Sequence, residues 1–191
     1  MSDGNGFADE IRAFIESPEG ALLRSDVASW AKWRRVPHET PDDVFTAFES
    51  IFARFPEFRS LVDYRLRSAG VFQDAFLHPN LRRRTELHIF TPTIGEGFRI
   101  QHGHSTWVMA ESIGCGFHVN QNVTIGEWKG ARPIIGNNVS IYSGAVVVGG
   151  ARIGDRVAIG GNVFVNFDVE DDSIVIQGPP TIKKRKLQSI G

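Results

Sequence analysis

The sequence predicts an α+β protein in which an N-terminal helical region is followed by a parallel β-solenoid with three flat faces. The main observation is a period of six residues in the second half of the chain. Aliphatic residues keep this period at Ile135, Ile141, Val147, Ile153, Ile159 and Val165. An amphipathic helix repeats every 3.6 residues and a single strand every 2. A period of six therefore indicates short strands and turns, stacked coil upon coil so that each repeat buries its neighbour.

The composition favours a cytoplasmic protein that binds neither nucleic acid nor a membrane. The chain has 191 residues and a formal net charge of −1. It therefore lacks the excess positive charge that would attract a polyanionic partner. No apolar run approaches the ~20 residues that span a bilayer. The acidic start, MSDGNGFADE, lacks the features of a secretory signal. A single cysteine excludes an intrachain disulfide framework.

Residues 1–86 are predicted to form a helical region and its connector. Phe7, Ile11 and Phe14 have helical spacing, and the segment 17–20 (Ser-Pro-Glu-Gly) ends that run. Further helices are expected around 27–33, 44–55 and 58–66, and a cap formed by residues 40–43 precedes the one at 44–55. Residues 71–86 form a connector that contains three consecutive arginines at 82–84. The aromatic faces of these helices are interpreted as core or subunit packing.

Residues 87–178 are predicted to form the solenoid, and residues 179–191 a tail with the basic run 183–186. The period breaks twice. Ile100 and Ile113 are thirteen residues apart, which leaves one extra residue around 102–107. Ile125 and Ile135 are ten apart, so four extra residues in 126–133 must leave the coil as a loop. Irregularities in a strict repeat are where function tends to be located.

Histidines at the first break are the strongest candidates for chemistry. A histidine with a pKa near neutrality can accept a proton from a hydroxyl group. His102 is favoured because it lies two residues after an inward isoleucine, and His104 is its nearest competitor. A hydrogen-bonded structural role for His102 remains the alternative. His118 precedes the inward Val119 and is expected to be structural.

A metal site is not expected. Zinc takes three or four ligands in a tetrahedral arrangement, and no C-x-x-C or H-x-x-x-H spacing occurs in the chain. Cys115 is the only thiol, and an isolated cysteine is more often a small apolar residue than a nucleophile.

From Phe58 onward the chain resembles the serine acetyltransferase-like branch of hexapeptide-repeat acyltransferases. The resemblance is carried by residues 58–66, by 94–103 with its Gln-His-Gly, by 120–126 with its Val-Thr-Ile-Gly, by 133–139 and by 178–180. It implies a left-handed parallel β-helix of hexapeptide repeats, a known exception to the right-handed crossover rule. It also implies a homotrimer with active sites between subunits, and acetyl-CoA as co-substrate.

The same resemblance implies roles for individual residues. His102 matches the general base, and Glu86, with His88 two residues later, resembles the acidic segment that orients it, although the spacing is one residue longer. Gln101, His104 and Arg132 are expected to contact the acceptor. The cofactor groove is expected to include Trp128, Ser143, Gly144, Ala145, Gly160, Gly161 and Lys184.

The chain departs from serine acetyltransferases at the acceptor site, and this favours a different acceptor. Gln101 stands where the family has aspartate, and Ala131-Arg132 stands where it has Arg-His. The sequence therefore predicts O-acetylation of a sugar or polysaccharide precursor, with the branch found in polysaccharide biosynthesis as the nearest pattern. Serine O-acetylation for cysteine biosynthesis, a non-catalytic trimeric scaffold and a metal-dependent hydratase on the same fold remain alternatives.

Overall fold

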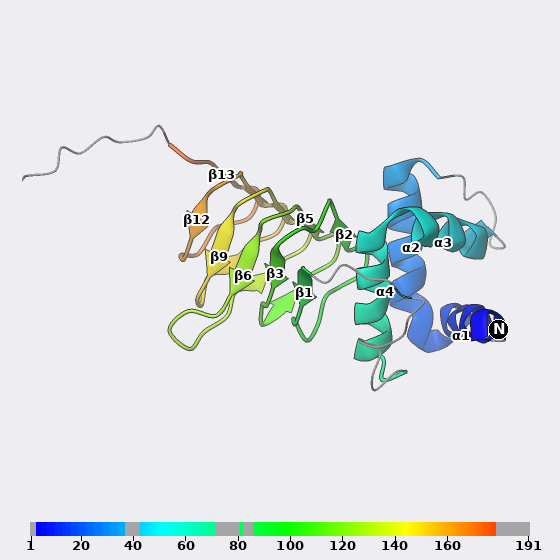
Figure 1. The fold of residues 1–191 in the computed structure, drawn as a ribbon. Coiled ribbons are helices and arrows are strands. Elements are labelled where there is room, and N and C mark those ends of the chain that lie inside the picture. The colour runs from blue at the N-terminus through cyan, green and yellow to red at the C-terminus, as the bar shows by residue number, and fades with distance from the viewer. Residues whose placement is uncertain (1–2, 37–42, 72–80, 82–85, 179–191) are drawn as a thin grey trace, which may run out of the picture.

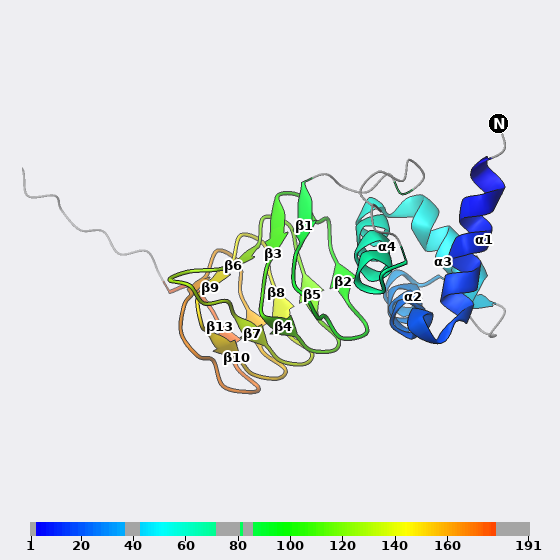
Figure 2. The same ribbon diagram turned by 90° about the horizontal axis from the view of Figure 1, so that it is seen from below.

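The computed structural model describes residues 3–36, 43–71, 81 and 86–178, and it contains a helical region and a solenoid. The helices are α1 (Asp3–Glu16), α2 (Ala21–Arg34), α3 (Asp43–Arg54) and α4 (Pro56–Ser68), with a 3-10 turn, η1 (Pro18–Gly20), between α1 and α2. The helices gather at one end of the solenoid, where α2 and α4 face its first coil (Figures 1 and 2). The four predicted helices are confirmed, and η1 coincides with the predicted break.

The solenoid is built from short parallel strands. In chain order they are β1 (Leu87–Ile89), β2 (Arg99–Ile100), β3 (Thr106–Val108), β4 (Ser112–Ile113), β5 (His118–Val119), β6 (Thr124–Gly126), β7 (Ile134–Ile135), β8 (Ser140–Ile141), β9 (Val146–Val148), β10 (Arg152–Ile153), β11 (Ala158–Ile159), β12 (Phe164–Val165) and β13 (Ile174–Val175). They form three sheets with the orders β1-β3-β6-β9-β12, β10-β7-β4 and β13-β11-β8-β5-β2. We call these sheets A, B and C in that order.

The residues of the six-residue period point inward and stack from coil to coil, as predicted. In sheet C, Ile100, Val119, Ile141 and Ile159 are successive register partners. Sheets A and B carry equivalent columns, for example Val108, Ile125, Val147 and Val165 in sheet A. All of these side chains are buried. The repeat therefore builds one continuous aliphatic core, which no single coil could form alone.

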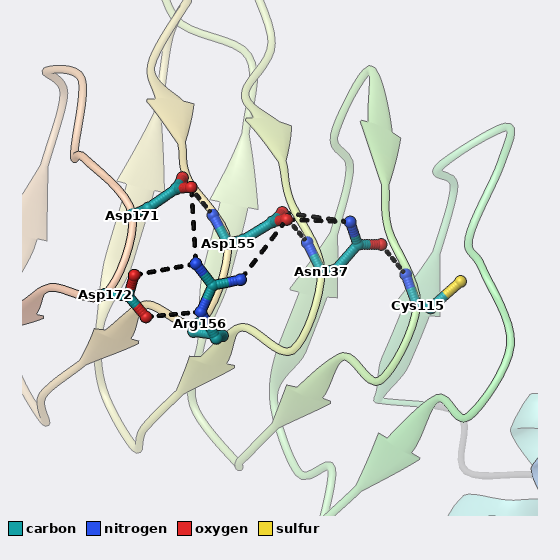
Figure 3. A network of polar contacts seen from close by, with 6 residues as sticks. All are labelled: Cys115, Asn137, Asp155, Arg156, Asp171 and Asp172. Atoms are coloured by element: carbon teal, nitrogen blue, oxygen red, sulfur yellow. Dashed lines mark hydrogen bonds and ion pairs between the residues drawn. The ribbon is translucent and has the colours of Figure 1, made fainter.

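Polar side chains form a second, external column at the corners where sheet B ends (Figure 3). The side chain of Asn137 accepts a hydrogen bond from the Cys115 backbone N–H at 2.9 Å, and Asp155 accepts from that of Asn137 at 2.7 Å. Asp171 extends the column, because its side chain accepts a hydrogen bond from the Asp155 backbone N–H at 2.8 Å. Each carboxylate or amide thus satisfies a turn in the preceding coil, so this cluster of acidic residues has a structural explanation.

A buried ion pair joins the helices to the solenoid. Arg65 of α4 donates to Asp26 of α2 at 2.7 Å and to the carbonyl oxygens of Ile94 and Gly95, both at 2.6 Å. Asp26 also accepts the backbone N–H of Phe98 at 2.9 Å. Burial raises the pKa of Asp26, while Arg65 and the Phe98 N–H oppose that shift by stabilising the carboxylate. The first coil is therefore fixed to the helical region by charged groups that are almost fully buried.

His118 lies on the same joint, which supports the structural role expected for it. Its ring meets Trp33 of α2 edge-on at 5.5 Å between centroids, and Tyr142 at 6.3 Å. Its Nε2 atom is buried without a hydrogen-bond partner. Burial, followed by the nearby charges of Arg99 and Arg34, lowers the pKa of His118 to about 4.

Several predicted features lie outside the described residues. They are most of the cap at 40–43, the arginines at 82–84 and the tail 179–191, which includes Lys184. No described helix is long and apolar enough to cross a bilayer.

Candidate functional site

The first break of the repeat lies at the corner between sheet C and sheet A. Eight positions separate the inward Ile100 of β2 from the inward Val108 of β3, and five separate Val108 from Ile113. The corner therefore holds two more residues than a six-residue repeat, and the next corner holds one fewer. The sequence predicted the net surplus of one but not this division.

The chain crosses this corner with unusual backbone geometry. His102 has a φ of 69° and Gly103 a φ of 62°, both in the left-handed region. Gly103 is required here, because a Cβ would lie 3.1 Å from both Ile100 and Leu87. The His102 side chain is exposed and has no hydrogen-bond partner among the described residues. The backbone thus presents this imidazole to solvent at the edge of the solenoid.

Glu86 pairs with His104, not with His102 as the resemblance implied. The Glu86 Oε1 atom lies 3.0 Å from Nδ1 of His104. Register explains the contact: Leu87 pairs with Thr106 across β1 and β3, so Glu86 stands beside the residues that immediately precede Thr106. A carboxylate that fixes the tautomer of a histidine is a typical arrangement for a general base. His104 is thus a stronger rival to His102 than the sequence alone suggests.

The second break is a loop that projects at the corner between sheets A and B, between β6 and β7 (Figure 1). Trp128 and Ala131 form an antiparallel bridge, which closes the loop as a small hairpin. Glu127 and Arg132 form an ion pair of 3.2 Å across its base. Gly149 of the next coil lies under Trp128, and a Cβ there would come within 3.3 Å of the indole. The loop is therefore closed at its base and packs on the next coil.

Both breaks open onto one cleft on the outer face of sheet A. The cleft has a volume of about 680 Å³, within the range of small-molecule sites. Its lining residues are Glu86, His88, Ser105, Thr106, Trp107, Met109, Thr124, Gly126, Glu127 and Val148. Glu86, which holds His104, comes from the side of the first break, and Glu127, which holds Arg132, from the second. Two irregularities that are separate in sequence thus converge in space.

The residues predicted to contact the cofactor mostly follow one edge of the solenoid. Ser143 and Gly144 lie between β8 and β9, and Gly160 and Gly161 between β11 and β12. These are corners from sheet C to sheet A, the same edge on which His102 lies. Ala145 is fully buried in the core, so its side chain cannot line a groove. Trp128 lies apart, in the loop.

Packing also accounts for the glycines on this edge. A Cβ at Gly160 would lie 3.0 Å from the Val175 carbonyl oxygen, and one at Gly161 would lie 3.1 Å from that of Ser143. Gly144 has a φ of 76°. Their small size is therefore required by the coil itself, whatever lies along the edge.

Within the described ranges, no group of three histidine, cysteine, aspartate or glutamate side chains is arranged to hold a metal ion. Asp63, a possible source of a further carboxylate from the helices, is buried and pairs with Arg67 at 3.1 Å. It does not line the cleft.

Comparison with known proteins points to one group of enzymes. Residues 132–166 match the family model described as bacterial transferase hexapeptide (six repeats). A serine acetyltransferase of Helicobacter pylori is 37% identical over 89 residues, covering 44% of this chain and 52% of that protein. One of Synechococcus elongatus is 36% identical over 92 residues, covering 45% of this chain and 37% of that protein. Part of the chain thus matches hexapeptide-repeat transferases, and the chain resembles serine acetyltransferases.

Solved structures extend the likeness to the fold. Serine acetyltransferase isoform 3 of Entamoeba histolytica, in complex with cysteine, matches with a TM-score of 0.58 and 26% identity, covering 86% of this chain and 60% of that one. The serine acetyltransferase of Brucella abortus matches with a TM-score of 0.64 and 20% identity, covering 90% of this chain and 72% of that one. The predicted fold class is thus confirmed: helices followed by a left-handed parallel β-helix of hexapeptide repeats. The chain spans about half the length of the Helicobacter pylori relative.

The sequence pointed to Trp107 and Trp128 as aromatic residues that flank the two breaks, but it did not point to Glu127 or Phe90. Glu127 falls within the four-residue surplus, and that surplus was its only signal. Phe90 and Trp107 stand on strands that are distant in sequence, and only the coil register brings them together. His88, predicted through the acidic segment, does line the cleft.

Proposed function

We propose that this protein is an acetyl-CoA-dependent O-acetyltransferase that acetylates a hydroxyl group of a small acceptor. The observation that carries the proposal is the meeting of both repeat breaks in one cleft, with an ion pair at each side. A solenoid that served only as a scaffold would need neither break. The likeness to serine acetyltransferases supports the type of reaction.

In the proposed mechanism a histidine at the first break is the general base. His102 is the candidate that matches the family, and its exposed imidazole lies on the edge expected to hold the acyl donor. The base takes the hydroxyl proton as the acceptor oxygen attacks the thioester carbonyl carbon. The carbon–sulfur bond then breaks, and the departing thiolate recovers the proton from the imidazolium. His104, held by Glu86, would orient the acceptor or the corner itself.

The proposed assembly is a homotrimer in which the acyl donor lies between neighbouring subunits. The exposed aromatic side chains on sheet A are consistent with partial cover by another copy. The mass of such a trimer would be three times the 21.2 kDa of one chain. Light scattering that shows a stable monomer would remove the intersubunit site.

Two acceptors are considered, and the comparisons favour L-serine over a sugar, because the similar proteins are serine acetyltransferases. A sugar hydroxyl is the second candidate because Gln101 is neutral where the family carries aspartate. An ammonium group beside His102 would lack its charge-assisted contact there, which is worth about 1.5–3 kcal/mol.

The test is acceptor-dependent release of free thiol from acetyl-CoA. Purified protein is incubated with acetyl-CoA and either L-serine or a panel of sugars, and the acetylated product is identified by mass spectrometry. The proposal predicts thiol release that requires an acceptor and yields one acetyl group per thiol. Absence of release with every acceptor, from a well-folded protein that forms trimers, would count against acetyl transfer and favour the scaffold.

A further inference from the structure

Three aromatic rings form a wall on the outer face of sheet A. His88 and Phe90 are close to parallel at 5.9 Å between ring centroids, and Trp107 packs against them at 4.7 Å and 5.1 Å. His88 and Trp107 are register partners across β1 and β3. Phe90 is 45% exposed and Trp107 39% exposed. The rings thus support one another and still present a broad apolar surface to solvent.

This wall borders the cleft close to the first break of the repeat. His88 and Trp107 line the cleft together with Glu86, the residue that holds His104. A ligand that rests on the wall would therefore lie beside the first break.

The polar groups of the cleft indicate what kind of ligand fits. Two carboxylates, Glu86 and Glu127, and the exposed Thr124 line it. No lysine or arginine is among its lining residues in the part of the chain that the structure describes. Carboxylate oxygens accept hydrogen bonds from hydroxyl groups, and the nearby cation Arg132 is already paired with Glu127. The cleft is thus better suited to a neutral ligand rich in hydroxyls than to a phosphorylated one.

We propose that the cleft binds a neutral pyranoside, whose apolar ring face rests on Trp107 and Phe90 while its hydroxyls reach the carboxylates. This inference rests on the proposed acetyl transfer, since the pyranoside would be the acceptor. An aromatic wall beside carboxylates offers both an apolar surface and hydrogen-bond acceptors, which are the two things a sugar ring presents. Free L-serine has no ring face and would use little of a cleft of about 680 Å³. Trp107 is then a residue that determines specificity.

The experiment compares Trp107→Leu with Trp107→Phe. Leucine keeps an apolar side chain but removes the aromatic face, whereas phenylalanine keeps a ring. Phe164→Leu is the matched control, because Phe164 occupies the same row of sheet A through Thr124 and Val146 but lies outside the cleft. Thiol release from acetyl-CoA is measured with methyl β-D-glucopyranoside and related methyl glycosides, with glucose 6-phosphate and with L-serine.

We expect Trp107→Leu to raise KM for the best methyl glycoside about 5- to 20-fold with little change in kcat. Trp107→Phe should restore most of the loss, and Phe164→Leu should behave as wild type. Glucose 6-phosphate should be a poor acceptor in every variant. An equal KM for the glycoside in wild type and Trp107→Leu would overturn the inference. So would efficient turnover of L-serine with no glycoside accepted.

A binding measurement separates failure of this inference from failure of acetyl transfer. Tryptophan fluorescence is titrated with the same glycosides in the absence of acetyl-CoA. If no acceptor is acetylated, acetyl transfer fails, and quenching by glycosides that is lost in Trp107→Leu would still support the pyranoside site. If L-serine is acetylated and glycosides neither quench nor react, only the pyranoside site fails. A change of oligomeric state in Trp107→Leu, with the glycoside response retained, would assign the wall to subunit packing and overturn the inference.

Discussion

The helical region and the solenoid obtain their stability in different ways. In the solenoid, equivalent aliphatic residues stack in three columns, so the core is distributed over many similar contacts. Where the helices meet the solenoid, the buried ion pair of Asp26 and Arg65 makes contacts that are not repeated elsewhere in the described residues. The difference teaches that a repeat spreads stability evenly, whereas departures from it concentrate stability or chemistry at single residues.

The first prediction tests the buried ion pair between the helices and the solenoid, and it has the largest expected effect on stability. Asp26→Ala leaves the Arg65 guanidinium buried without its anionic partner, and the loss should be about 3–5 kcal/mol. The measurement is the urea midpoint followed by circular dichroism, with the m-value used to convert it. The double variant Asp26→Leu/Arg65→Met should recover part of the loss, since it removes both charges. A single variant as stable as wild type would show that the joint does not depend on this pair.

The second prediction tests the aliphatic core of the solenoid. Ile141 lies in the middle of the sheet C column between Val119 and Ile159, and it is 1% exposed. Ile141→Ala should destabilise by about 2–4 kcal/mol through lost burial and the cavity that remains. Ile159→Ala, one coil further on, should cost a similar amount. Very unequal losses at these two positions would contradict the even distribution.

The third prediction concerns the pH dependence of stability, which tests His118 at the contact between the helices and the solenoid. The pKa of His118 is about 4 in the fold, against 6.5 in a free histidine, so the unfolded chain binds more protons between these values. Stability from this residue should therefore be complete above pH 6.5 and fall as the pH drops toward 4. Because the residue is only partly buried, the loss should be about 1–3 kcal/mol.

His118→Phe is the informative variant, since phenylalanine can pack on Trp33 and Tyr142 and has no group that titrates. The difference in stability between wild type and His118→Phe should be constant above pH 6.5 and shift in favour of the variant below it. Parallel pH profiles for the two proteins would contradict the altered pKa.

The fourth prediction concerns the exposed polar column and has the smallest expected effect. Arg156 bonds to Asp172 at 2.8 Å and lies 3.7 Å from Asp171, and its charge is exposed (Figure 3). Exposed ion pairs contribute little and are screened by salt. Arg156→Ala should leave the urea midpoint almost unchanged at 0.15 M salt. A loss comparable to that of Ile141→Ala would show that the corners, and not the core, carry the solenoid.

The sequence predicted the solenoid far better than the site, for a physical reason. The period of six fixes both the inward residues and their register, so Ile100, Val119 and Ile141 could be identified without a structure. The helices followed from their apolar spacing, but nothing in that spacing pairs Asp26 with Arg65. The site lies where the period fails, and there no rule relates position in sequence to position in space. The sequence therefore pointed to His102 and the loop, but it did not predict that Glu86 would contact His104, and it did not point to Glu127.

The account's central claim is that the first break of the repeat is a catalytic corner, and His102→Ala tests it most directly. The variant is compared with wild type and with His104→Ala by acceptor-dependent thiol release under saturating acetyl-CoA. Circular dichroism and light scattering verify that each protein is folded and assembled. The account predicts that kcat in His102→Ala falls by roughly two to four orders of magnitude, while the urea midpoint is retained. Full activity in folded His102→Ala, with the loss found in His104→Ala instead, would transfer the role of base to the histidine that Glu86 holds. Full activity in both variants would contradict the claim.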